Sequence, residues 1–293
     1  MPELPEVESI VRGLRKKILD KKIVDVWTDN NKMVKQPKNF NSFKKQLRGK
    51  KVRRVKRRGK NILIDLSDNK TLLIHQKMTG HLLFGKWQMK KGKWISMIKG
   101  LMLSDPKNDY LHFIIFFKDG NQLALSDLRK FAKIELWDKN ELKVSEGFKK
   151  LGSEPLEKSF TFEKFKQALN KRKKGKIKQV LMDQNVIAGI GNIYSDEILW
   201  RSKVHPFKDV SRLKEPELKR IYQSIKVILK KAVKLKGTSI SDFRLVDGTK
   251  GFYGLKHKAY QKQGEKCFRC KTKITRKKIG GRSAHFCPQC QKL

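Results

Sequence analysis

The chain has 293 residues, with 71 Lys or Arg against 28 Asp or Glu, so its formal net charge is +43. This length accommodates two domains. The positive charge indicates a polyanionic partner, of which nucleic acid is the most obvious. A ribosomal-type protein or a protein bound at a membrane surface would carry a similar charge. No apolar run approaches the roughly 18 residues that span a bilayer, and the acidic N-terminus lacks the apolar core of a signal peptide, so we expect a soluble, cytoplasmic protein without a membrane partner.

The first predicted element is an amphipathic helix near the N-terminus. Pro5 and Glu6 suit its first turn. Its apolar residues recur at helical spacing, and they are Val7, Ile10, Val11, Leu14 and Ile18.

Between Lys22 and about Leu136, short apolar runs separated by turn clusters predict an antiparallel sheet or sandwich. The runs are 62–66, 71–74, 111–117 and 122–125. The segments 67–69 and 118–121 predict hairpin turns. The Lys- and Gly-rich stretch 86–105 fits neither period, and we expect an irregular connection there.

The second half of the chain is predicted to be helical. Apolar spacing indicates helices beginning near Phe162 and Ile177, and a long helix through 218–232 that ends by Gly237. Between them, the turn 188–191 is followed by Asn192 at the position of a helix N-cap. Helix N-termini beside glycines bind phosphate, although such Gly-x-Gly turns also serve only for packing.

All four cysteines lie near the C-terminus as two Cys-x-x-Cys pairs, Cys267 with Cys270 and Cys287 with Cys290. The spacing suits four thiolates around one structural zinc ion, with two disulfides as the alternative. The basic residues between the pairs predict either a hairpin on phosphates or a solvated turn, and they are Arg276, Lys277, Lys278 and Arg282.

The fold class expected is α+β. We divide the chain into an N-terminal antiparallel β-sandwich with flanking helices (2–146), a linker (147–158), a helical DNA-binding domain (159–258) and a zinc-finger β-hairpin (259–293).

Pro2 follows the initiator methionine, whose removal would expose a secondary amine. Amines at the chain terminus titrate near pH 8, so part of the population is neutral and nucleophilic. Glu3 and Glu6 lie beside it and could transfer protons. On these residues alone, such an acidic, proline-containing segment is usually just an ordinary N-terminus.

Taken in order, the motifs resemble the formamidopyrimidine-DNA glycosylase family nearly end to end. They are 2–8, 57–60, 75–80, 127–131, 151–156, 183–194 and the zinc finger with Gly281-Arg282-Ser283. The segment 183–194 resembles the family's helix–two-turn–helix. The resemblance implies a bifunctional DNA glycosylase and AP lyase. Such an enzyme removes oxidised purines, namely 8-oxoguanine and formamidopyrimidines, and then nicks the strand by β,δ-elimination.

The resemblance also implies four catalytic roles. Pro2 attacks C1′ and forms a Schiff base, and Glu3 acts as an acid at the sugar. Lys60 contacts phosphate and assists the first elimination. Arg282 contacts the lesion phosphates from the zinc finger and assists the second, so that it would meet Pro2 across the flipped nucleotide.

Further residues would hold the DNA. Met78, Arg129 and Phe131 would fill the space left by the flipped nucleotide, unless Met78 and Phe131 are simply core. Lys174 and Asn192 would contact the backbone. The partner implied is double-stranded DNA with oxidised purines or AP sites, bound by a monomer that is nucleoid-associated when on DNA. The segment 246–255 resembles a mobile loop over the base, the alternative being an ordinary loop.

Three positions depart from the family pattern. Ala132 replaces a glycine after Phe131, and Asn108 begins an Asn-Asp-Tyr segment where His-Asp-His is usual, which puts a phosphate contact of Asn108 in doubt. Gln261 replaces the glycine of a Tyr-Gly-Arg segment, where Lys262 keeps the positive charge for DNA.

Two rivals differ in testable ways. The related endonuclease VIII enzymes prefer oxidised pyrimidines and usually carry glycine where this chain has Leu4. A non-catalytic DNA- or RNA-binding zinc protein would need none of Pro2, Glu3 and Lys60.

Overall fold

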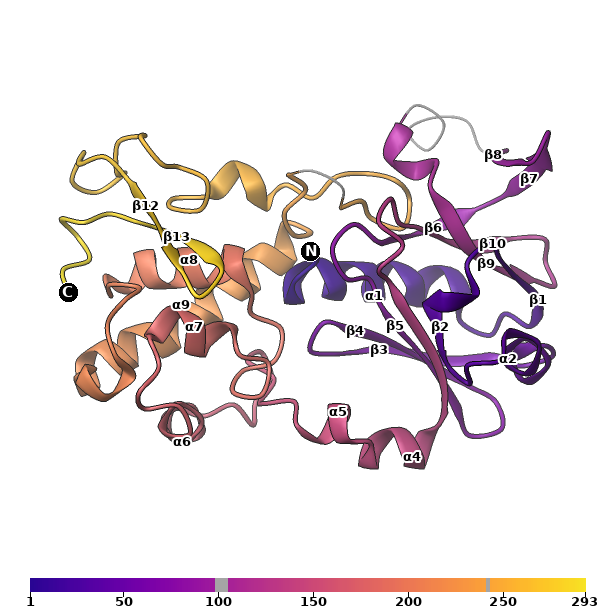
Figure 1. Ribbon diagram of the computed structural model, residues 1–293, viewed down its shortest axis with the longest axis horizontal. Helices are drawn as coiled ribbons and strands as arrows, with labels where there is room; N and C mark the ends of the chain where they lie inside the picture. Colours follow the sequence, from indigo (N-terminus) through magenta and orange to yellow (C-terminus); the bar gives the residue numbers. More distant parts are fainter. Residues whose placement is uncertain (98–104, 241–242) are drawn as a thin grey trace. The chain divides into compact units, whose positions relative to one another are not determined.

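The structure, a computed structural model, describes residues 1–97, 105–240 and 243–293, and it has the expected α+β class (Figure 1). The chain forms two compact units. Unit 1 comprises Met1–Lys149 and Lys236–Phe252, and unit 2 comprises Lys150–Leu235 and Tyr253–Leu293. Among the described residues, no helix is both long enough and apolar enough to cross a membrane.

The described residues of unit 1 form two stacked sheets, a hairpin and four α-helices. One sheet has the strand order β1-β9-β10-β6 and is antiparallel; the other has the order β2-β11-β5-β4-β3 and is antiparallel except for the parallel pair β2–β11. The elements are α1 (Leu4–Ile18), β1 (Ile23–Thr28), β2 (Val34–Gln36), α2 (Phe40–Leu47), β3 (Val52–Arg58), β4 (Asn61–Leu66), β5 (Lys70–His75), β6 (His81–Gly85), β7 (Trp87–Lys90), β8 (Lys93–Ser96), β9 (Leu111–Phe117), β10 (Gln122–Ser126), β11 (Lys133–Asp138), α4 (Lys139–Val144) and α5 (Glu146–Lys149).

The predicted strands and hairpin turns are confirmed. The turn at 67–69 joins the antiparallel pair β4–β5, and the turn at 118–121 joins β9–β10. One continuous core lies between the two sheets and takes in the apolar face of α1. The helix forms because Glu3 and Glu6 complete a capping box at its start, and its apolar residues, three and four apart, share one face.

The outer faces of both sheets are also covered. The stretch 86–105 was expected to be irregular, but residues 87–96 form the hairpin β7–β8, and residues 98–104 lie outside the described part of the chain. Trp87 and Trp94 of this hairpin pack on the outer face of the four-stranded sheet, where Trp94 meets Trp27 edge-on with ring centroids 5.2 Å apart. Leu142 of α4 and Phe148 of α5 cover the other sheet.

The segment Lys236–Phe252 packs in unit 1, whereas the sequence-based division placed it with the helices of 159–258. Its contacts are specific. The backbone N–H of Thr238 donates to Glu6 Oε1 at 2.6 Å, and that of Phe84 donates to the carbonyl of Val246 at 2.7 Å. Gly237 has a φ of +78°, and a Cβ there would lie 2.6 Å from the Glu6 carboxylate. The segment therefore belongs to the sandwich by its hydrogen bonds.

Unit 2 is helical and ends in a two-stranded hairpin. Its elements are α6 (Phe162–Asn170), α7 (Ile177–Met182), α8 (Asn192–Ser202), α9 (Glu215–Lys234), β12 (Thr275–Ile279) and β13 (Arg282–Phe286), with the 3₁₀ turns η3 (Val210–Arg212) and η4 (Tyr253–Lys256). Helix α8 packs against both α9 and β13 (Figure 1). The predicted helices near Phe162 and Ile177 and the long helix before Gly237 are thus confirmed.

The turn before α8 differs in one detail from the expectation. Gly191, not Asn192, is the N-cap, and Asn192 is the first helical residue, because Gly191 takes the extended conformation that a cap requires. Gln184 holds the turn: its side-chain amide donates to the carbonyls of Met182 and Ile190 at 2.8 and 2.7 Å and accepts from the N–H of Gly189 at 2.8 Å.

Candidate functional site

The N-terminal segment is held at the start of α1 in unit 1. Pro2 is buried, and Glu3, which is 2% exposed, is the N-cap of the helix. The backbone N–H of Glu3 donates to Glu6 Oε2 at 2.8 Å, while the other oxygen of Glu6 accepts from Thr238. Glu6 thereby ties the N-terminus to the returning segment 236–252.

Lys60 lies in the turn between β3 and β4 and is 6% exposed. The turn is fixed by Arg57, whose guanidinium donates to the carbonyl of Gly59 at 3.0 Å and to Glu8 of α1 at 3.2 Å. Burial, with the charges of Lys77, Lys60 and Lys133, lowers the pKa of His75 to about 3. His75 is therefore neutral at pH 7, and its Nδ1 accepts from the backbone N–H of Lys77 at 3.0 Å.

The two segments expected to fill the flipped-out position are brought together. Residue 78 lies in the loop after β5, and residues 129 and 131 lie in the turn after β10. Thr79 Oγ1 donates to the fully buried carboxylate of Asp127, and the same hydroxyl accepts from the N–H of Arg129 at 3.2 Å. One hydrogen-bonded contact therefore joins both loops.

The side chains of Arg129 and Phe131 on these loops are exposed to solvent. Met78 is half-buried, whereas Phe131 is 53% exposed, with the Arg129 guanidinium 4.5 Å from its ring centroid. Lys130, between them, has a φ of +55°. Large exposed apolar side chains on a cationic loop are typical of a binding surface rather than a core. The sequence alone left open that Phe131 is a core residue, and its exposure shows that it is not.

Two residues that depart from the family pattern, Ala132 and Asn108, have hydrogen-bond partners in the structure. Ala132 is buried, and its N–H donates to Asp127 Oδ2 at 2.8 Å. Asn108 is only 4% exposed, and its Oδ1 lies 2.9 Å from Nε2 of His81. Among the described residues, its Nδ2 has no hydrogen-bond partner. A phosphate contact by Asn108 would therefore require the side chain to leave this buried pair.

In unit 2, a buried ionic network supports the start of α8. Lys178 and Asp196 are fully buried and joined at 2.6 Å, and Asp196 Oδ2 also accepts from Nδ1 of His285 at 2.8 Å. Lys178 Nζ additionally donates to Ser195 Oγ at 3.1 Å. The network connects α7, α8 and β13. It therefore fixes Asn192, at the start of α8, relative to the zinc-finger hairpin.

A second buried carboxylate anchors the approach to the zinc finger. Glu197 accepts from the backbone N–H groups of Lys258, Ala259 and Tyr260 at 2.9–3.0 Å. Burial raises the pKa of Glu197 despite these three donors. The backbone immediately before Gln261 is consequently held rigidly against α8.

The four cysteines converge as the sequence predicts. Their Sγ atoms all lie within 4.8 Å of one another, and they are free thiols rather than disulfides. Tetrahedral zinc with Zn–S distances of about 2.3 Å needs sulfurs ~3.8 Å apart, which this cluster matches. Zinc held by Cys267, Cys270, Cys287 and Cys290 would have no open position, so it would stabilise the hairpin and take no part in chemistry.

The expected backbone-binding cations of unit 2 lie at its surface. Lys174 is exposed in the turn after α6, and Arg282 is exposed at the start of β13, beside the left-handed Gly280 and Gly281. Lys262 is half-buried and pairs with Glu265 at 3.1 Å. Exposed ion pairs contribute little, so DNA could displace Glu265 at small cost.

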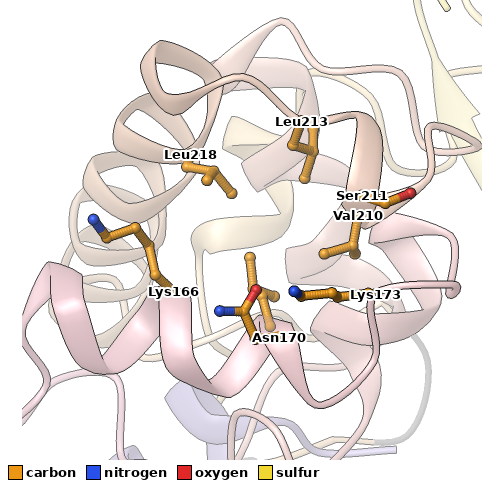
Figure 2. A pocket seen from close by; sticks show the side chains of 8 residues that line it. Lys166, Asn170, Lys173, Val210, Ser211, Leu213 and Leu218 are labelled. Atoms are coloured by element: carbon orange, nitrogen blue, oxygen red, sulfur yellow. The ribbon is translucent and has the colours of Figure 1, made fainter.

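Figure 2 shows a hollow of about 320 Å³ on unit 2. Its polar side chains are Lys166, Asn170, Lys173 and Ser211, and its apolar side chains are Leu169, Val210, Leu213 and Leu218. None of the residues to which the resemblance gives a role lines this hollow.

Several residues that organise the site escaped the sequence analysis. Asp127, Asp196 and Glu197 are buried acids in a strongly basic chain, and Glu8 supports the turn of Lys60 through Arg57. Their positions in the sequence could have indicated them. An acidic residue inside or beside a phosphate-binding motif repels phosphate, so it is expected to neutralise or orient a specific partner.

Three family models together match most of the chain: the N-terminal domain of formamidopyrimidine-DNA glycosylase (residues 1–134), its H2TH domain (151–244) and a zinc finger found in FPG and IleRS (264–293). A formamidopyrimidine-DNA glycosylase of Pelotomaculum thermopropionicum is 38% identical over 293 residues, covering 100% of both chains. One of Streptococcus pneumoniae is 37% identical, covering 100% of this chain and 99% of its own.

Solved structures agree. Lactococcus lactis Fpg in complex with abasic-site DNA has a TM-score of 0.85 at 35% identity, covering 99% of this chain and 100% of that one. The same organism's Fpg (MutM) with N7-benzyl-Fapy-dG DNA has a TM-score of 0.86 at 36% identity, covering 100% of both. The resemblance inferred from the motifs is confirmed, and the chain belongs to the formamidopyrimidine-DNA glycosylase family.

Proposed function

We propose that this protein excises oxidised purines from duplex DNA through a Schiff base on Pro2 and then nicks the strand by β,δ-elimination. Family membership carries the coarser statement that the chain is a DNA glycosylase with AP lyase activity in base-excision repair. We also propose that the protein acts in the cytoplasm, because its substrate would be genomic DNA. The finer mechanism rests on how the N-terminus is held.

The observation that carries the mechanism is the position of Pro2 directly before the capped start of α1. An α-amine titrates near pH 8, so part of it is neutral at pH 7, and a neutral secondary amine is the nucleophile that forms an iminium. The Pro2 nitrogen attacks C1′ as the bond from C1′ to the base breaks, and the base leaves with the bonding electrons. Met1 must be removed first, because an amide nitrogen cannot attack.

The elimination steps need proton transfer and charge stabilisation. Glu3 beside the amine is the proposed acid: it protonates O4′ as the C1′–O4′ bond breaks, the sugar ring opens and the lone pair of the Pro2 nitrogen forms the iminium. Loss of a C2′ proton from the iminium breaks the C3′–O bond, and a second elimination breaks the C5′–O bond. We assign Lys60 to the phosphate released first and Arg282 to the second, because cations at a departing phosphate stabilise its developing charge.

Binding would be shared by surfaces on both units. Met78, Arg129 and Phe131 would occupy the stack vacated by the flipped nucleotide, and the exposed aromatic and guanidinium groups of their loops support this role. On unit 2, we assign DNA backbone contacts to Lys174, Asn192 and Lys262.

The test is trapping with borohydride, which reduces an iminium to a stable amine. The processed protein is mixed with a duplex containing 8-oxoguanine opposite cytosine, and we expect a covalent complex. A variant with one extra N-terminal residue should form none, whereas Pro2→Gly should retain part through its primary amine. No complex with correctly processed wild type would overturn the mechanism and leave a DNA-binding protein.

A parallel duplex tests the base preference. A Lactococcus lactis Fpg structure contains oxidised-pyrimidine DNA, so a pyrimidine lesion such as thymine glycol belongs in the same assay. We expect the purine lesion to be processed faster. Faster trapping on thymine glycol would favour the endonuclease VIII-like alternative.

A further inference from the structure

The start of α8 borders a small pocket of about 170 Å³ within unit 2. Its lining comes from the helix start, the turn after Tyr260 and the zinc-finger hairpin. The lining residues are Asn192, Tyr260, Gln261, Gln263, Arg276, Ser283 and His285. Polar donors dominate this set, and no carboxylate is among them, so the pocket suits an anion at the positive end of a helix.

The pocket is built on a rigid base. His285 is 4% exposed, and its backbone N–H donates to Asp196 Oδ2 at 3.1 Å. Its Nδ1 lies 2.8 Å from the same oxygen. Asp196 is in turn paired with the buried Lys178. On the rim, Nε of Arg276 donates to Ser283 Oγ at 3.0 Å. Groups fixed in this way need little reorganisation when an anion enters.

Gln261 occupies this rim at a backbone conformation that favours glycine. Its φ is +57°, in the left-handed region where a Cβ is unfavourable. The preceding backbone is pinned by Glu197, and the N–H of Lys262 donates to the carbonyl of Ala259 at 3.0 Å. The turn therefore imposes this conformation on whichever residue stands at 261. Glycine would fit better, and it is what the family pattern has here.

We propose that Gln261 is a DNA-positioning residue: its side-chain amide donates a hydrogen bond to a backbone phosphate seated in this pocket. The chain keeps a strained residue at 261 because the amide adds a donor that glycine lacks. Asn192 lines the same pocket, and its Oδ1 has no hydrogen-bond partner within the described residues. Because an amide oxygen only accepts, a contact of Asn192 with the same phosphate would be made by its Nδ2 donors. This inference rests on the proposed function, since it assumes a DNA ligand.

A neutral donor leaves a distinctive signature. Lys and Arg contacts release counterions, so their loss reduces the dependence of affinity on salt. Loss of an amide contact weakens binding at every salt concentration without changing that dependence. Gln261→Gly should also relieve the backbone strain. Affinity and stability should therefore move in opposite directions, which a purely structural residue would not produce.

The experiment measures anisotropy of a labelled duplex carrying a tetrahydrofuran abasic-site analogue, from 50 to 300 mM salt, with thermal melting of each protein. For Gln261→Gly we expect about 5–10-fold weaker binding, an unchanged salt slope, full zinc content and a melting temperature roughly 2–4 °C higher. Gln261→Ala should bind as weakly without gaining stability. Gln289→Ala, a surface glutamine outside the pocket, is the matched control and should behave as wild type.

The outcomes separate the two proposals. Wild-type affinity in Gln261→Gly, or a reduced salt slope, would overturn the role of Gln261 while wild-type trapping by borohydride still supports the proposed function. Wild type that neither binds the abasic duplex better than an undamaged one nor traps would overturn the proposed function itself.

Discussion

The hydroxyl of Thr79 donates to the buried carboxylate of Asp127, which links the loop after β5 to the turn after β10. Each loop carries residues proposed to enter the DNA stack, so their relative position depends on one side-chain pair. The left-handed φ values of Lys77 and Lys130, 53° and 55°, show that both turns are tight. A conformation of this kind persists only where surrounding contacts enforce it.

Replacing Thr79 by Val should therefore impair base excision. The change removes the hydroxyl that donates to Asp127 Oδ1 and accepts from the N–H of Arg129, which we expect to lower stability by about 1–3 kcal/mol and excision of 8-oxoguanine by roughly 10-fold. Nicking of a pre-formed AP site should fall less, since no base must be extruded. Single-turnover kinetics on both substrates measure this, and Thr79→Ser, which keeps the hydroxyl, is the control. Equal losses on the two substrates would contradict the role of the loops in extrusion.

The buried pair in unit 2 should be strongly destabilised by removal of one partner. Lys178→Met leaves Asp196 charged in the interior with only His285 to compensate, and such changes cost about 3–5 kcal/mol. In Lys178→Met/Asp196→Asn neither residue of the pair is charged, so the double variant should be more stable than the sum of the single changes predicts. Chemical denaturation of the four proteins completes the cycle. Additive free energies would show that the two residues act independently.

Zinc removal should unfold the C-terminal hairpin and abolish tight DNA binding. We expect one zinc ion per chain by elemental analysis and four thiols that become titratable on chelation, because metal binding and folding of such a site are coupled. Affinity for abasic-site DNA should drop by at least 10-fold, since the hairpin carries Arg282, and should return when zinc is restored. Full binding by the metal-free protein would contradict this assignment.

Stability should fall at acidic pH in part through His75. Its folded pKa of about 3 lies below the unfolded value of about 6.5, so the unfolded chain binds more protons between these values. Stability is therefore fully present above pH 6.5 and declines as the pH falls toward 3. At pH 4.5 the loss from this residue is about 2–3 kcal/mol. His75→Asn keeps an acceptor for Lys77 but cannot titrate, so its melting temperature should decline less between pH 7 and 4.5. Parallel curves would rule this contribution out.

Local patterns predicted a large part of this fold. The strand runs, the hairpin turns, the N-terminal helix and the zinc ligands each follow from spacing within a few residues, and the structure has them all. The hairpin of 87–96 was missed because lysine and glycine conceal its alternation. Its anchors, Trp87 and Trp94, were the available signal, since tryptophan in a basic stretch usually packs somewhere.

What could not be predicted is mostly long-range. The attachment of 236–252 to unit 1 depends on Glu6 meeting Thr238, which are 232 positions apart. No periodicity encodes such a pair. The same holds for Asp196 with His285, separated by 89 positions. The roles of the catalytic and DNA-contacting residues came from the resemblance, and they stay predictions until the experiments above are performed.

The return of 236–252 to the sandwich gives the chain an interrupted order: unit 1 begins, is left at Lys149, is rejoined at Lys236 and is left again after Phe252. Residues 150–235 and 253–293 form unit 2, so each of the two units is built from two separate stretches of the chain. A gene fragment ending at Lys149 would lack the partner of the Glu6 carboxylate and the Val246 side chain that lies against Gly13. The units therefore cannot be exchanged between relatives by a single crossover. An exchange of whole units would need three junctions, after Lys149, after Leu235 and after Phe252.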